Sequence, residues 1–109
     1  MIDPAKIAEA CERAEHVLRR ERLIDWKVEV IDDPKMLGWC IQSRRTIQLT
    51  LTCIALGPEQ VEDTIMHEVA HAIIDTRPHN YGHHALTELL KRKHSGDERY
   101  GPQGEPLWQ

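Results

Sequence analysis

The sequence predicts a single α+β domain, built from an N-terminal helix, a three-stranded antiparallel sheet and two further helices. Apolar residues recur at spacings of three and four in residues 4–22 and 58–77, which is the period of an amphipathic helix. Between these segments, residues 26–51 show the alternation of strands. A chain of 109 residues with 40% hydrophobic and 29% charged residues suits one soluble domain with a modest core.

The first helix has a clear start at residues 3 and 4. Asp3 is a good N-cap because its carboxylate can accept a hydrogen bond from the first turn, and Pro4 suits the first helical position. The apolar stripe that follows consists of Ile7, Cys11, Ala14 and Leu18. We therefore expect a helix from Pro4 to about Arg22 that buries this stripe.

Three segments have the alternating pattern of strands: 26–30, 36–41 and 46–51. The first two are separated by Asp32-Asp33-Pro34 and the last two by Ser43-Arg44-Arg45, both of which are turn sequences. Since consecutive strands joined by short connections usually pair, we expect an antiparallel meander.

A second helix opens at Gly57-Pro58-Glu59, with proline near its first position and an acid in its first turn. Pro78 ends it by about Arg77. Its apolar face is formed by Val61, Ile65, Val69, Ala72 and Ile73. The opposite side is more polar, so we expect the helix to pack by one face and present the other to a cleft.

A short loop leads to a third helix, which we expect from His83 to about Lys93. Its predicted buried face consists of Ala85, Leu86, Leu89 and Leu90. Residues 95–109 contain three glycines and two prolines and show no periodicity. We therefore expect a domain over residues 1–94 and an extended, partly mobile C-terminal tail over residues 95–109.

Composition disfavours several classes of protein. The net charge of −4 argues against a broadly basic nucleic-acid surface. No run approaches the roughly 20 apolar residues of a membrane span, and the N-terminus lacks an apolar signal region. Cys11, Cys40 and Cys53 form no C-x-x-C pair, so we expect reduced, buried thiols in a cytoplasmic protein.

The second helix carries the motif H-E-x-x-H, in His67-Glu68-Val69-Ala70-His71. Residues four apart share one face of a helix, so both imidazoles can bind one metal ion, and Glu68 is placed to act as a general base. Asp75 lies about 12 Å along the helix axis from His67 and is too distant to complete the site. It remains a candidate for orienting His71.

Catalytic zinc usually has three protein ligands, so a third must come from another part of the chain. The candidates are His79, His83, His84 and Glu88. The helical phase places His84 and Glu88 toward solvent and His83 at the edge of the core, facing the second helix. We therefore favour His83 as the third ligand, with His79 and Glu88 as alternatives.

These features resemble the SprT-like zinc metallopeptidases, which include the Spartan-type proteases. The resemblance covers residues 5–93: a helix, a small sheet, the H-E-x-x-H helix, and a Gly-His pair, Gly82-His83, that begins the next helix. It implies a zincin-like fold, a Zn²⁺ ion held by His67, His71 and His83, and peptide hydrolysis with Glu68 as the base. It resembles a compact bacterial or phage version, because the cysteine zinc ribbon of many members is absent.

The resemblance implies a protein substrate of narrow specificity, and we expect a monomer. Tyr81 and His79, in the loop before the third ligand, are candidate accessory donors to an oxyanion. Nucleic acid is a weaker candidate partner, because no DNA-binding segment is evident. Two other functions remain open: a regulatory peptidase that cleaves a repressor, and an inactive, zinc-stabilised binding module.

Overall fold

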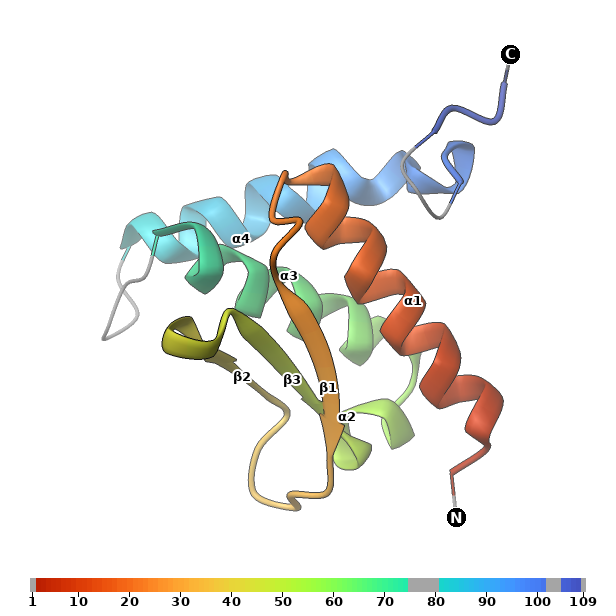
Figure 1. The fold of residues 1–109 in the computed structure, drawn as a ribbon, viewed down its shortest axis with the longest axis vertical. Helices are drawn as coiled ribbons and strands as arrows, with labels where there is room; N and C mark the ends of the chain where they lie inside the picture. Colours follow the sequence, from red (N-terminus) through yellow and green to blue (C-terminus); the bar gives the residue numbers. More distant parts are fainter. Residues whose placement is uncertain (1, 75–80, 102–104, 109) are drawn as a thin grey trace.

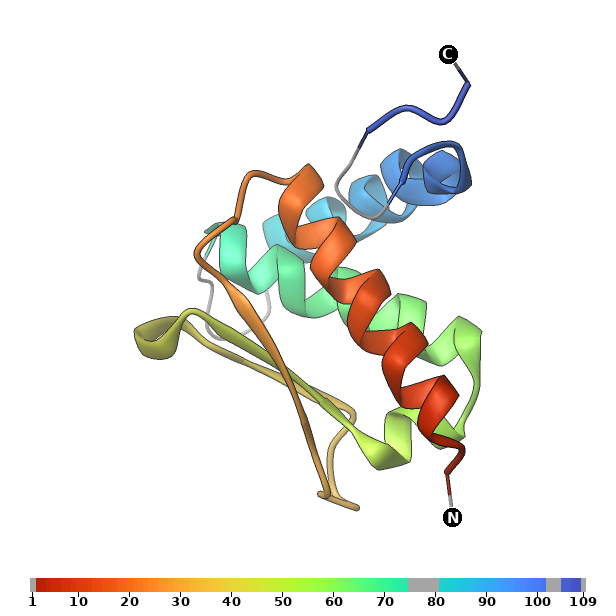
Figure 2. The same ribbon diagram turned by 45° about the vertical axis from the view of Figure 1, so that its right-hand side comes forward.

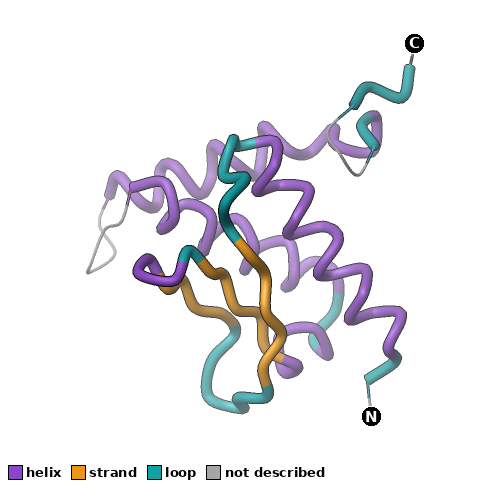
Figure 3. Tube along the Cα trace, in the orientation of Figure 1, coloured by secondary structure: helices purple, strands orange, loops and turns teal. Residues whose placement is uncertain are grey.

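The computed structural model describes residues 2–74, 81–101 and 105–108, and it has the predicted α+β class (Figures 1 and 3). This part of the chain contains four α-helices and one small sheet. The helices are α1 (Pro4–Arg20), α2 (Leu51–Ala55), α3 (Pro58–Ile74) and α4 (Tyr81–Lys93). The strands are β1 (Lys27–Ile31), β2 (Gly38–Ile41) and β3 (Thr46–Thr50), and the 3-10 segments are η1 (Gln42–Arg44) and η2 (His94–Arg99).

Helix α1 begins as predicted. The Asp3 carboxylate accepts a hydrogen bond from the Ala5 amide at 2.9 Å, and Pro4 is the first helical residue. The helix ends at Arg20, two residues before the expected end. Two arginines in its last turn suit the negative end of the helix dipole.

The sheet is mixed, so the predicted antiparallel meander is wrong. The strand order is β1-β3-β2, with β1 parallel to β3 and β2 antiparallel to β3. Strand β3 takes the centre because four of its five residues are buried, whereas β1 and β2 are more exposed and lie at the edges. Alternation identified the strands, but it did not reveal which strand requires two neighbours.

Two short elements connect the sheet to its surroundings. The turn expected at residues 43–45 is formed by η1, and Arg45 has the left-handed backbone conformation. Helix α2 was not predicted, because Leu51 continues the alternation of β3 and was assigned to the strand. Thr50 ends the strand and caps this helix: its hydroxyl oxygen accepts a hydrogen bond from the Cys53 amide at 3.0 Å.

Helices α1 and α3 lie on the same side of the sheet (Figure 2). Helix α1 packs against β1, and α3 packs against β2 and β3. The core between these layers includes Val17, Leu18, Ile47, Leu49, Ile65, Met66 and Val69. Cys11, Cys40 and Cys53 form no disulfide; Cys40 and Cys53 are buried and Cys11 is partly exposed. Among the described residues, no helix has the length and apolar character needed to span a membrane.

Helix α4 packs along α3 through a face that includes Leu86 and Leu90, as predicted, but differs from the prediction at its other positions. Ala85 and Leu89 are exposed, whereas His83, Thr87 and Leu90 are buried. The prediction followed hydrophobicity alone, and two of the residues that α4 buries are polar. The face of α3 that carries the histidines is therefore covered by α4 and does not simply line an open cleft.

Part of the C-terminal segment has regular structure, whereas an extended tail was expected. Residues 94–99 form η2, in which His94 and Asp97 are buried. Tyr100 then makes an isolated antiparallel bridge with Pro106. Trp108 packs edge-on against the Tyr100 ring at 5.0 Å between centroids, although it remains half-exposed.

Candidate metal centre

Helix α3 places two of the predicted ligands, one turn apart, on the face that meets α4. The His67 and His71 rings lie 5.1 Å apart between centroids. His83, in the first turn of α4, lies 4.6 Å from the His67 ring and 4.0 Å from the His71 ring. One ring nitrogen of each residue lies within 4.8 Å of the other two. The three histidines are therefore close enough to bind one metal ion.

The three rings differ in their exposure to solvent. His71 is 8% exposed and His83 only 2% exposed, whereas His67 is half-buried. His83 is thus more deeply placed than the core edge that the helical phase predicted. His67 is therefore the most exposed of the three histidines.

A direct contact joins the two helices within this group. The Nε2 atom of His83 lies 3.1 Å from the backbone carbonyl oxygen of His67. A carbonyl oxygen only accepts, so this contact is a hydrogen bond when His83 carries its proton on Nε2, which places the lone pair of the neutral ring on Nδ1. The Thr87 hydroxyl donates to the His83 carbonyl oxygen at 2.9 Å, within the same turn of α4.

Glu68 follows His67 on α3 and is 6% exposed. It lies against β2 at Gly38: a Cβ atom built on Gly38 would lie 3.3 Å from the Glu68 Cγ and 2.7 Å from the Thr64 Cγ2. Only glycine therefore allows the strand to approach α3 this closely. Burial and the negative charge of Glu68 raise the pKa of the Cys53 thiol. The hydrogen bond with Thr64 lowers this pKa but does not offset them.

Gln42, in η1 between β2 and β3, binds the C-terminal end of α3, a role that the sequence did not reveal. Its side-chain amide donates to the His71 carbonyl oxygen at 2.7 Å and to that of Ala72 at 3.4 Å. These carbonyls belong to the last turns of α3, where intrahelical donors run out. A glutamine between a strand and an arginine turn carries no recognisable chemical pattern, so sequence reasoning had no signal for it.

The other candidate ligands are not part of the group among the residues that the structure describes. His84 and Glu88 are exposed on α4, as predicted, and Glu88 pairs with the Lys91 ammonium at 3.2 Å. Asp75 and His79 lie outside the described residues. Tyr81 is the first residue of α4, but its side chain is outside the described part.

The donor set fits a divalent transition metal. Three neutral imidazoles suit zinc and leave a fourth position of a tetrahedral site for water. No family model, curated protein or solved structure matches the chain, so the functional assignment depends on the site itself.

Proposed function

We propose that the chain is a zinc-dependent metalloendopeptidase, of the SprT-like kind that the sequence resembles. The observation that carries the proposal is the convergence of His67 and His71 on α3 with His83 on α4, beside the carboxylate-bearing residue Glu68. Three imidazoles and an adjacent carboxylate are the parts that metal-assisted hydrolysis needs.

When bound, the zinc ion would lower the pKa of a coordinated water and polarise the scissile carbonyl. Glu68 then acts as the general base: its carboxylate accepts the proton of the attacking water and passes it to the leaving amine. Because Glu68 is buried between α3 and β2, its side chain has few alternative positions. His79 and Tyr81 remain candidate donors to the oxyanion.

The edge of the sheet provides a way to hold a protein substrate. Strand β2 is an edge strand of the sheet that the described residues form, and its Gly38 lies against Glu68. An extended peptide can add to such an edge through main-chain hydrogen bonds, which brings its backbone close to the catalytic groups. Trp39, 48% exposed on this strand, is available for an apolar contact. An unfolded segment is the form of substrate that can pair in this way.

Two alternatives use the same geometry. A regulatory peptidase that cleaves a repressor would share the metal and the base and differ only in its substrate. A zinc-stabilised binding module would use the three histidines alone. Glu68 favours an enzyme over that module, because a purely structural metal site needs no base.

The test compares the wild type with Glu68→Gln, with the exposed Glu88→Gln as matched control. Each protein is loaded with one equivalent of zinc and incubated with an unfolded protein, with and without DNA, and self-cleavage is followed in parallel. We expect cleavage by the wild type and the control, and a loss of about a hundredfold or more for Glu68→Gln. Stimulation by DNA would favour a DNA-associated substrate. Equal inertness of all three zinc-loaded proteins would contradict the peptidase assignment.

A further inference from the structure

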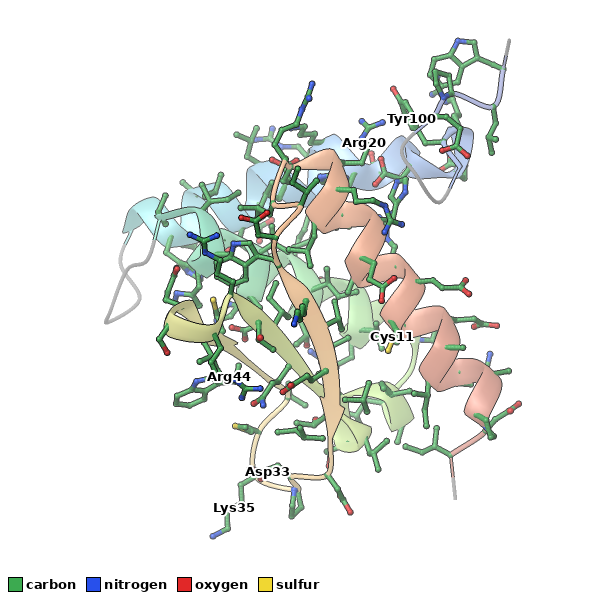
Figure 4. The ribbon with its side chains drawn as sticks, in the orientation of Figure 1. Cys11, Arg20, Asp33, Lys35, Arg44 and Tyr100 are labelled. Atoms are coloured by element: carbon green, nitrogen blue, oxygen red, sulfur yellow. The ribbon has the colours of Figure 1, made fainter. Side chains whose placement is uncertain are left out.

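A second cluster of titratable groups lies away from the metal centre, where α1, the end of α4 and η2 meet. Figure 4 shows Arg20 at the C-terminal end of α1 beside Tyr100 of the C-terminal segment. The Arg20 guanidinium lies over the Tyr100 ring, 3.6 Å from its centroid. The cluster beneath this contact joins residues about 80 positions apart in the sequence, such as Arg13 and Asp97.

His94 occupies the centre of the cluster, and its side chain is completely buried. Its Nδ1 atom lies 2.5 Å from the Asp97 carboxylate, and its Nε2 atom lies 2.7 Å from the Glu21 carboxylate. A carboxylate only accepts, so both contacts are hydrogen bonds only when both ring nitrogens carry protons. The geometry is therefore that of an imidazolium held between two carboxylates. Lys93 also reaches Glu21, at 2.8 Å.

Asp97 connects His94 to helix α1. Its carboxylate accepts a hydrogen bond from Arg13 at 2.9 Å, and the Arg20 guanidinium lies 3.9 Å away. His16 faces the same carboxylate from α1, at 3.3 Å. Arg13 also donates to the Glu62 carboxylate on α3, with one contact at 2.9 Å. The C-terminal segment is thus held to α1 by charged groups, and Arg13 links the same cluster to α3.

The pKa shifts of Glu21, Asp97 and His16 are consistent with this arrangement. Burial alone would raise the pKa of Asp97 and of Glu21, but hydrogen bonds from His94, and from Lys93 to Glu21, outweigh burial and lower both. Burial and the nearby Arg13 lower the pKa of His16 despite the attraction of Asp97. His16 therefore favours the neutral form.

We propose that His94 is a proton-dependent latch, which holds residues 94–101 against α1 when its ring is doubly protonated and releases them when the ring loses a proton. The neutral ring would keep one hydrogen bond and direct a lone pair at the other carboxylate, leaving two buried acids without their shared cation. A cavity of about 500 Å³ lined by His16, His94 and Asp97 borders the cluster, so solvent can exchange protons with it.

The sign of the pH effect follows from the charges. The hydrogen bonds from His94 to Asp97 and Glu21 both exist while both ring nitrogens carry protons, and one of them is lost when the ring releases a proton at higher pH. The pKa values of Glu21 and Asp97 are lowered in the folded protein. Their contributions to the stability of the folded state are therefore lost as pH falls through those values. The latch is therefore closed between these limits and opens at both ends of the pH range.

The latch is independent of the proposed peptidase activity and is tested without it. Amide hydrogen exchange of residues 94–101, corrected for the intrinsic pH dependence of exchange, is measured from pH 5 to 9. The wild type is compared with His94→Gln and with His84→Gln, which changes an exposed histidine on α4. We expect the wild type and the control to lose about tenfold or more of their protection as pH rises, since hydrogen bonds to buried charges carry at least that factor. His94→Gln should show low protection throughout.

A measurement on the wild type alone keeps the proposal open to refutation if His94→Gln does not fold. Nitrogen-15 NMR of the imidazole ring distinguishes two protonated nitrogens from one. We expect His94 to carry both protons wherever residues 94–101 are protected. A neutral His94 ring in a protected segment, or equal protection of His94→Gln and the wild type at every pH, would overturn the latch.

Discussion

Gly38→Ala is the most informative single substitution at the strand that supports Glu68. The added methyl would lie 2.7 Å from the Thr64 Cγ2, 3.0 Å from the Gln48 carbonyl oxygen and 3.3 Å from the Glu68 Cγ. The first of these is closer than carbon atoms approach without repulsion, so β2 and α3 must move apart. The backbone of Gly38 lies outside the left-handed region, so the penalty comes from overpacking.

The magnitude follows from the two opposing effects. Overpacking in a filled interface costs about 1–3 kcal/mol. The lower chain entropy of the unfolded alanine variant returns about 0.4–1 kcal/mol. A net loss of about 1–2 kcal/mol corresponds to a fall in Tm of roughly 4–16 °C for a domain of this size. The rate of cleavage should fall by more than the loss of folded protein alone would explain, because the added methyl also displaces the Glu68 side chain.

Thermal and urea unfolding of the metal-free protein measure the Tm and the free energy of unfolding. Gly96→Ala is the matched control, since a Cβ there has no neighbour closer than 3.9 Å. Thr64→Ser removes the clashing methyl but keeps the hydroxyl that Cys53 and Gln60 contact. We expect Gly38→Ala/Thr64→Ser to recover part of the lost stability, with a coupling energy of about 0.5 kcal/mol or more. Unchanged stability and cleavage in Gly38→Ala would refute the close approach of β2 to α3.

Three further substitutions or conditions test other parts of the fold. Leu90→Ala should lower the free energy of unfolding in urea by roughly 2–5 kcal/mol, because Leu90 is buried. Leu89→Ala should lower it by less than about 0.5 kcal/mol, because Leu89 is exposed. Equal losses would contradict the observed phase of α4. Gln42→Ala should weaken zinc binding several-fold in calorimetry, because it releases the C-terminal end of α3; unchanged affinity would argue against this positioning role. Stability should fall as pH drops through the lowered pKa values of Glu21 and Asp97, and a flat acid limb in chemical denaturation would contradict their pairing.

The sequence identified the elements that local chemistry determines. The start of α1 was predictable because an N-cap aspartate and a first-turn proline act within a few residues, and the hydrogen bond to the Asp3 carboxylate confirms it. The pairing of His67 and His71 was predictable because helical geometry alone brings residues four apart together. His83 lies close to His67 and His71, as expected, although it is more deeply buried than the core edge that helical phase predicted; its role as a metal ligand stays a prediction.

The features that the sequence missed depend on partners distant in the chain. Strand order depends on which strand is paired along both of its edges. This is decided only when the sheet packs against the helices, so it cannot be read from one segment of sequence. The buried face of α4 was predicted only in part, because the helix buries the polar residues His83 and Thr87 in place of Ala85 and Leu89, which hydrophobic periodicity cannot anticipate. The order of residues 94–99 depends on ionic contacts with α1, and such contacts leave no periodic pattern.

The central claim is that His67, His71 and His83 form one metal centre, and a zinc titration tests it most directly. Calorimetry compares the wild type with His83→Ala and with His84→Ala, after circular dichroism confirms that each variant is folded. We predict binding of one zinc ion by the wild type and His84→Ala, and a loss of affinity of a hundredfold or more for His83→Ala. Full retention of zinc affinity by His83→Ala would contradict the three-histidine centre.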